Sequence, residues 1–210
     1  MKSIFKAGLL VSLLAIPVLI YLFLQIFGQN YYSLPIYYQN NATSAPDDCT
    51  NFTEAQQVDW SNIQKYSSQL NLNNEKITVF AAISDDCDQE CQIKFNQASR
   101  LANNYVNQDS LQIVVVIINE QSSDTSEIKK PTDLNNLKFV NLNVELWRQF
   151  SHCELLLPYS DISEVNINDQ FVLLDGKSRI RGYYNGLSLE DIDRLTTEIR
   201  LLLYEYQHQT

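Results

Sequence analysis

Two cysteines four residues apart, Cys87 and Cys91, are the side chains in this sequence best suited to chemistry. They directly follow the β-branched and aromatic run from Lys76 to Ile83, which predicts a buried strand. Residues four apart share a face in the first turn of a helix, so the two sulfurs can form a disulfide or bind one ion. The spacing therefore predicts a redox dithiol that is open to solvent, with Cys87 as the more exposed sulfur and Cys91 as its partner.

A helix from Asp88 to Tyr105 is predicted to position this dithiol. Its apolar residues recur at spacings of three and four: Cys91, Phe95, Ala98, Leu101, Ala102 and Tyr105. The positive end of the helix dipole stabilises a thiolate, whereas neighbouring carboxylates raise the pKa of a thiol; these are Asp85, Asp86, Asp88 and Glu90. Each effect is about 1 kcal/mol or less at an exposed site, so the sequence leaves the sign of the net shift open.

Metal binding is a second use of the same pair. Two soft thiolates favour Cu(I), and an imidazole would complete a trigonal site. The chain has two histidines: His208 ends the last predicted helix, and His152 adjoins Cys153. The candidate copper ligands are therefore Cys87 and Cys91, with His152 as a third, although a lone histidine is more often a surface or core residue. A purely structural disulfide is the alternative.

The other two cysteines, Cys49 and Cys153, are isolated in sequence and can meet only through the fold. In an oxidising compartment an even number of cysteines permits two disulfides. The alternatives are a structural bridge between Cys49 and Cys153, or two free buried thiols.

The amino terminus predicts a membrane anchor over residues 1–28. The segment from Ile4 to Phe27 is almost wholly apolar, and as a helix the part from Ala7 to Phe27 could cross the ~30 Å core of a bilayer. Lys2 and Lys6 precede it and the next basic residue is Lys65, so the positive-inside rule places the remainder outside the cytoplasm. We therefore expect a single-pass protein of the inner membrane with its carboxyl-terminal domain in the periplasm; a cleaved signal peptide is the rival interpretation.

The rest of the chain predicts one domain. Residues 29–50 lack periodicity and indicate an extended linker, and residues 51–210 indicate an α/β domain. Further strands are expected at Ile113–Ile118, Lys138–Leu142 and a hairpin, Gln170–Leu174 with Arg179–Tyr184, whose turn contains Gly176 in a position able to take φ > 0. Helices are expected at 144–150 and from Ser188 onward, the last with a capping box, and residues 60–72 are expected to form a short helix or an irregular approach to the first strand. This order implies a thioredoxin-like mixed sheet flanked by helices.

Charge excludes one class of partner. The net charge is −10, and without Lys2 and Lys6 the remaining 13 basic and 25 acidic residues give −12. Such a chain repels nucleic acid. The sequence also contains no phosphate-binding glycine loop, zinc-type cysteine quartet or serine–histidine arrangement.

The assembled motifs resemble the Sco/SenC family of membrane-tethered, thioredoxin-fold copper chaperones. Cys87 and Cys91 match the family's CxxxC after the first central strand. Phe171-Val172-Leu173-Leu174-Asp175, with Gly176 to Gly186, is similar to its strand-turn-strand ending in RIRGYY-[DN]-G. The segment Phe27 to Pro35 resembles the membrane-proximal segment of Bacteroidetes-type members.

The resemblance implies a protein that delivers copper to cytochrome c oxidase or reduces a disulfide there, with a respiratory oxidase subunit or its assembly factors as partner. The sequence departs from the family at two positions. Asp88 stands where members usually have Pro, and their histidine aligns with Ile167, beside Asn166 and Asn168. Ile167 cannot bind copper, which leaves three alternatives: His152 replaces the histidine, the two thiolates bind copper alone, or only thiol–disulfide oxidoreductase activity is kept. The non-catalytic alternative is a degenerate binding module that keeps the fold, in which Cys87 and Cys91 form a purely structural disulfide.

Overall fold

The computed structural model of the chain describes residues 2–27, 34–38, 49, 57–59, 73–119, 133–157 and 169–208. The chain divides into two compact units, Met1–Ser33 and Leu34–Thr210. Residues 60–72, expected to form a short helix or an irregular approach to the first strand, lie outside the described residues.

The first unit contains one helix, α1 (Lys2–Phe27), of 26 residues with Pro17 inside it. Within the described residues, no helix combines the length and the sustained hydropathy that a bilayer crossing needs. The anchor expected over residues 1–28 is therefore not shown.

The second unit is built on one five-stranded sheet in the order β3-β2-β1-β4-β5. The strands are β1 (Ile77–Ser84), β2 (Leu111–Asn119), β3 (Leu137–Asn143), β4 (Gln170–Leu174) and β5 (Ile180–Asn185). β1 pairs with β2 and β2 with β3 in parallel, whereas β4 pairs antiparallel with both β1 and β5. The predicted mixed sheet, with parallel central strands and a late antiparallel hairpin, is confirmed.

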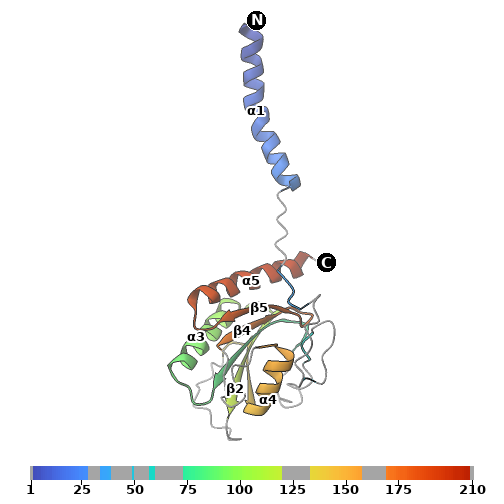
Figure 1. Cartoon of the computed structure of the whole chain (residues 1–210). Helices are drawn as coiled ribbons and strands as arrows, with labels where there is room; N and C mark the ends of the chain where they lie inside the picture. Colours follow the sequence, from blue (N-terminus) through green and yellow to red (C-terminus); the bar gives the residue numbers. More distant parts are fainter. Residues whose placement is uncertain are drawn as a thin grey trace. The chain divides into compact units, whose positions relative to one another are not determined.

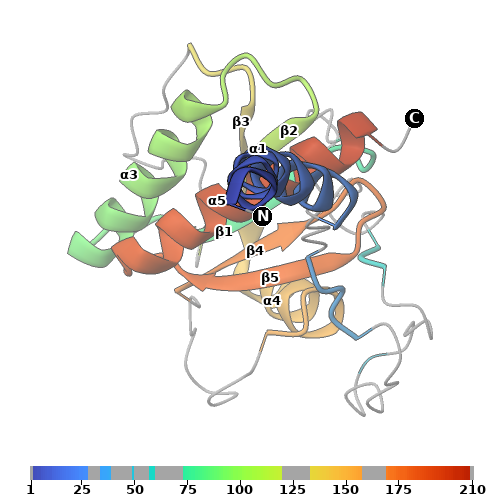
Figure 2. The same ribbon diagram turned by 90° about the horizontal axis from the view of Figure 1, so that it is seen from above.

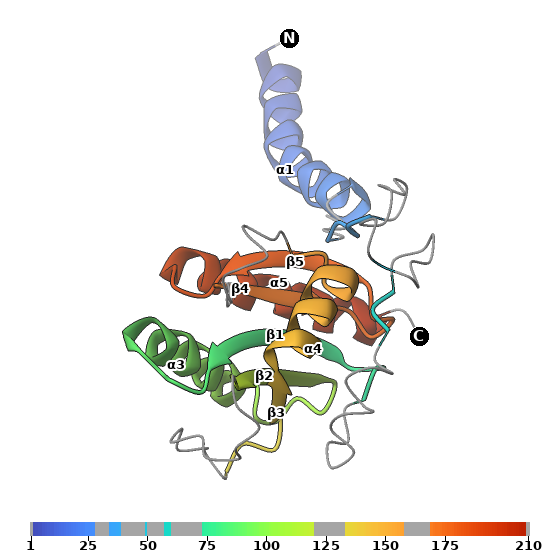
Figure 3. The same cartoon turned by 60° about the horizontal axis from the view of Figure 1, so that its bottom comes forward.

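Helices cover both faces of the sheet, which explains why the central strands are apolar throughout. The helical elements are α3 (Gln89–Asn104), α4 (Val144–Gln149), the π-helical turn η1 (Phe150–Glu154) and α5 (Leu189–His208). Figure 2 shows α3 and α5 on one face of the sheet and α4 on the other, and Figure 3 shows α4 in front of β1 and β2. All nine residues of β2 are buried, because successive side chains of a strand enter opposite layers.

Each layer has its own core. Val79, Ala81 and Ile83 of β1 pack with Cys91 and the apolar face of α5. The intervening residues Phe80 and Ala82 pack with the layer that contains α4 and η1. The sheet therefore separates α3, which carries Cys91, from η1, which carries His152.

The second unit begins before the predicted boundary near residue 51. Tyr37 donates its backbone N–H to the carbonyl oxygen of Ile180 at 3.0 Å, so the chain is already bound to β5 there (Figure 1). A disulfide joins Cys49 to Cys153, with a Cα–Cα distance of 5.5 Å. Of the two alternatives that the sequence leaves open for these cysteines, the structure has the bridge. Part of the expected linker, 34–38 and 49, is therefore bound to the domain.

The hairpin turn differs from its prediction in one respect. Gly176 does not have positive φ; Ser178 does, at 58°. A Cβ atom on Gly176 would meet the backbone oxygen of Glu75 and the hydroxyl of Tyr206. Glycine is required at this position by the close approach of neighbouring atoms rather than by left-handed backbone geometry.

Candidate functional site

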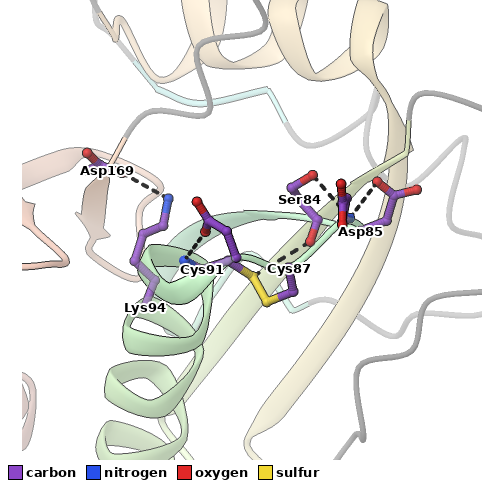
Figure 4. Close-up of a disulfide and its surroundings, with 8 residues drawn as sticks. Ser84, Asp85, Cys87, Cys91, Lys94 and Asp169 are labelled. Carbon is purple, nitrogen blue, oxygen red and sulfur yellow. Dashed lines mark hydrogen bonds and ion pairs between the residues drawn. A yellow bond between two sulfur atoms is a disulfide. The ribbon is translucent and has the colours of Figure 1, made fainter.

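The Cys87–Cys91 pair lies where the chain passes from β1 into α3, and the two residues form a disulfide with a Cα–Cα distance of 5.2 Å (Figure 4). Cys87 precedes the helix, and Cys91 lies in its first turn. In the parallel part of the sheet, Ser84 at the end of β1 is aligned with Ile118 near the end of β2. The disulfide is therefore at the edge formed by the carboxyl ends of the parallel strands.

Local hydrogen bonds explain why the helix begins here. Asp88 is the N-cap, and its Oδ1 accepts the backbone N–H of Cys91 at 2.8 Å. Before it, Asp85 donates its backbone N–H to the carbonyl oxygen of Ile118 at 3.1 Å, which extends the β1–β2 pairing by one residue. N-cap aspartates commonly stabilise a helix by about 1 kcal/mol. Asp88 therefore has a structural role in starting α3, which a proline at this position could not take, because proline has no side-chain acceptor.

The two sulfurs differ in accessibility. Cys87 is half-buried, whereas Cys91 is only 3% exposed and packs in the core. The Sγ atom of Cys91 lies 3.7 Å from the carbonyl oxygen of Ser84. The prediction that both sulfurs are open to solvent is corrected, because the amphipathic face of α3 draws Cys91 into the core. An incoming thiolate can reach the disulfide only through Cys87.

Acidic side chains surround the accessible sulfur. Asp86, Asp88 and Glu90 are exposed and Asp85 is half-buried. None of these four carboxylates forms an ion pair with the described part of the chain. Their negative charge and the positive end of the helix dipole therefore act in opposite directions on a charge at Cys87.

A buried cation lies on the same helix. Lys94 is 4% exposed, and its Nζ atom lies 3.0 Å from Oδ1 of Asp169 (Figure 4). Lys94 is not among the predicted site residues, because the helical spacing of apolar residues passes through Phe95 next to it. Phe95 is only half-buried, while Lys94 takes the core position three residues after Cys91.

The structure does not bring His152 to the dithiol. His152 lies in η1, in the layer across the sheet from α3. Within the described residues, no group of three or more His, Cys, Asp or Glu side chains could hold a metal ion. Ile167, Asn166 and Asn168, at the position of the family's histidine, lie outside those residues.

The hairpin that carries the family resemblance contains a buried charge network. Asp175, fully buried, accepts hydrogen bonds from the side chains of Arg179 at 2.8 Å and Arg181 at 3.1 Å. Burial alone would raise the pKa of Asp175, but hydrogen bonds from Arg179, the Lys177 backbone and Arg181 hold it below its ordinary value. This network anchors the hairpin and does not touch the dithiol.

The fold is similar to solved structures of Sco proteins. A SCO1/SenC family lipoprotein from Bacillus anthracis str. Ames matches with a TM-score of 0.50 and 16% sequence identity, over 65% of this chain and 85% of that chain. BsSco, a member of the Sco family of cytochrome c oxidase assembly proteins with an identified disulfide switch, matches with a TM-score of 0.42 and 13% identity, over 60% and 80%. Arabidopsis thaliana ScoI with copper bound matches with a TM-score of 0.43 and 14% identity, over 63% and 86%.

No protein-family profile matches the sequence. No curated protein matches it in sequence either. The chain therefore has the thioredoxin-like fold of the SCO1/SenC family lipoprotein that it matches.

Proposed function

We propose that this chain is a membrane-anchored Sco-like protein that exchanges disulfides and thiols through Cys87 and Cys91 and so assists the assembly of cytochrome c oxidase. The observation that carries the proposal is the half-buried Cys87 bonded to the buried Cys91 at the strand–helix junction of a thioredoxin-like sheet. The oxidase enters through the resemblance of the dithiol and the hairpin to the Sco/SenC family. The partner is a respiratory oxidase subunit or one of its assembly factors.

The exchange proceeds in two steps. A thiolate of a reduced partner attacks Sγ of Cys87, the bond between Cys87 and Cys91 breaks, and Cys91 leaves as a thiolate. A second thiolate of the partner then attacks the partner's own sulfur in the mixed disulfide, and Cys87 leaves. The partner loses two electrons and becomes a disulfide, and the dithiol of this chain gains them with two protons from solvent. In the reverse direction the reduced chain reduces a partner's disulfide, with Cys87 as nucleophile.

Delivery of Cu(I) is the second candidate function. Reduction of the pair leaves two soft sulfur ligands on residues whose Cα atoms are 5.2 Å apart, close enough to bind one ion together. The described residues offer no third ligand beside them. The proposal for copper is therefore two-thiolate binding of a cargo ion at Cys87 and Cys91.

The compartment is proposed from charge and cysteine chemistry. Lys2 and Lys6 precede the apolar span Ala7–Phe27, which favours a single-pass anchor with the domain on the periplasmic side of the inner membrane. Two disulfides in the second unit support an oxidising compartment. Extraction of membranes with alkaline carbonate tests the anchor: we expect the full-length chain to stay in the pellet, and release into the supernatant would contradict it.

The redox function is tested with the full-length chain in detergent. The protein is equilibrated in glutathione buffers of graded potential, and the oxidised fraction of each pair is read by alkylation and mass spectrometry. We expect the Cys87–Cys91 pair to titrate well above the ~−300 mV of structural bridges while Cys49–Cys153 stays oxidised. If Cys87–Cys91 is as resistant to reduction as Cys49–Cys153, the pair is a structural disulfide and the exchange function is wrong.

Partner and cargo have separate tests. In membranes, Cys91→Ser should trap an oxidase subunit or its assembly factor as a mixed disulfide on Cys87, and Cys87→Ser is the matched control that should trap none.

For copper, the reduced wild-type protein and Cys87→Ser are titrated with Cu(I) against a competing chelator. Tight binding that is lost in Cys87→Ser supports delivery, and binding that survives it contradicts the assigned ligands.

A further inference from the structure

The buried face of α3 contains one charged residue. The buried positions of this helix are Cys91, Lys94, Ala98, Leu101 and Ala102. The side chain of Lys94 is only 5% exposed, in a stripe that is otherwise formed by apolar side chains and a half-cystine. Burial of a charge costs free energy unless the charge is paired, so packing alone does not account for a lysine at this position.

Its ion pair is asymmetric. The Nζ atom of Lys94 lies 3.0 Å from Oδ1 of Asp169, whose side chain is 42% exposed. The ammonium group is therefore inside the protein, while its counter-charge is partly neutralised by water. The backbone of Asp169 is held separately, because its carbonyl oxygen accepts the N–H of Gly186 at 2.6 Å. The carboxylate can be changed without removing that anchor.

Helix geometry places Lys94 next to Cys91, the residue whose sulfur must leave, on the buried face of α3. Side chains three residues apart on a helix are neighbours, about 5–6 Å between Cβ atoms. Helical side chains also lean toward the amino terminus, so Lys94 lies over the turn that contains Cys91. Figure 4 shows the two residues at the start of α3, with the Lys94 side chain directed toward Asp169 beside that first turn.

We propose that Lys94 is a positioning residue for disulfide opening: its buried charge favours departure of the Cys91 sulfur, and Asp169 moderates that charge. The inference deepens the exchange function proposed above and rests on it. When a thiolate bonds to Sγ of Cys87, the electron pair of the broken bond remains on Sγ of Cys91. That negative charge forms in the core, on the buried face of α3 that also carries Lys94, before the sulfur takes a proton from solvent.

Burial decides which charges matter at this sulfur. Asp86, Asp88 and Glu90 are exposed, so water and salt screen their repulsion. Lys94 and Cys91 are both inside the protein, where an attraction between charges is screened much less. The carboxylates therefore act mainly on the approach to Cys87, and Lys94 acts on the departure of Cys91.

The test measures how fast a small neutral thiol, β-mercaptoethanol, reduces Cys87–Cys91 in the full-length protein at fixed pH, read by alkylation and mass spectrometry. We expect Lys94→Met to slow reduction by roughly three- to tenfold, because the leaving sulfur loses its counter-charge. Lys94→Arg should restore most of the rate. Asp169→Asn should accelerate reduction, because the charge of Lys94 is then less neutralised.

Lys138→Met is the matched control. Lys138 is a half-buried lysine near the first residue of β3, at the opposite end of the parallel strands from the dithiol. Its removal changes the net charge equally and should leave the rate unchanged. Thermal unfolding of each variant verifies that the fold is retained.

Opposite signs separate an electrostatic effect from a structural one. Breaking the ion pair from either side loosens the fold in the same sense, so a merely structural role predicts rate changes in the same direction for Lys94→Met and Asp169→Asn. That result, or an unchanged rate in Lys94→Met, overturns the inference. If Lys94→Met does not fold, Asp169→Asn decides alone, and an unchanged or slower rate there overturns it. The redox titration described above tests the exchange function separately. If the reduction potential of Cys87–Cys91 is as low as that of a structural disulfide, the exchange function is wrong, whatever the reduction rates of the Lys94 and Asp169 variants are.

Discussion

Arg181 donates a hydrogen bond from Nη2 to the backbone carbonyl oxygen of Leu34 at 2.8 Å, across 147 residues of sequence. The same guanidinium group pairs with Asp175 at 3.1 Å and with Glu205 at 3.3 Å, and the arginine is 4% exposed. Leu34 is the first residue of the second compact unit. One buried arginine therefore joins the start of this unit to the hairpin and to the end of α5.

Replacement of this arginine should destabilise the domain strongly. In Arg181→Met the buried Asp175 and the Leu34 carbonyl each lose a donor, and we expect a loss of about 3 kcal/mol in the free energy of unfolding. Urea unfolding followed by circular dichroism measures it. The control is Arg148→Met, which removes a solvent-accessible pair with Glu145 and should cost about 0.5 kcal/mol or less. Equal losses in the two variants would refute a special role for the network.

Acid should weaken the same network. The pKa of Asp175 is lowered from 3.8, so the native state holds the ionised form more tightly than the unfolded state does. Its stabilisation is fully present above the ordinary aspartate pKa and is lost as pH falls below it, through the lowered native value. We expect the difference in unfolding free energy between wild type and Asp175→Asn to be constant near neutral pH and to shrink below about pH 4. A difference that is independent of pH would contradict this.

Substitution of the turn glycine should be costly for steric reasons. In Gly176→Ala the new methyl group would meet the backbone oxygen of Glu75 and the Tyr206 hydroxyl. We expect a loss of roughly 1–3 kcal/mol, as for overpacked sites, in chemical unfolding. Gly8→Ala is the control, because nothing lies within 4 Å of a Cβ at that position. A neutral Gly176→Ala would show that the turn can relax.

The two disulfides should contribute differently to stability. Cys49–Cys153 links residues 104 apart and Cys87–Cys91 residues four apart. Loop-closure entropy then predicts that removing the long bridge, by Ser at both positions, costs about 2–3 kcal/mol more than removing the short one. The unfolding free energies of the two double variants test this directly. Equal costs would contradict a purely entropic contribution.

Once reduced, the two cysteines of the site should react at very different rates. Cys87 is half-buried and Cys91 is 3% exposed, so iodoacetamide should modify Cys87 faster by on the order of tenfold or more. Timed alkylation followed by peptide mass spectrometry gives both rates in one sample. Comparable rates would mean that the helix start opens in solution, and attack would then not be confined to Cys87.

Local patterns predicted most elements of the fold because their signals lie within a few residues. The β-branched runs of β1 and β2 and the spacing of three and four in α3 and α5 depend on neighbours in sequence. Ser188 accepts the backbone N–H of Asp191 at 3.3 Å, as the capping box indicates. Leu189, the first residue of α5, is apolar but exposed, which shows the limit of such patterns: at a helix end, periodicity alone does not determine burial.

By itself, the sequence determined that a dithiol would follow a buried strand and begin a helix, since an apolar run and a CxxxC lie within twenty residues of one another. Only the tertiary structure decided which sulfur is accessible, which cysteines pair at a distance, and which lysine lies on the buried face of the helix that carries Cys91. These features depend on how a helix rotates against a sheet and on contacts between residues far apart in the chain. Rotation about the axis of α3 by one residue would exchange Lys94 for Phe95, and packing against the rest of the domain determines that rotation.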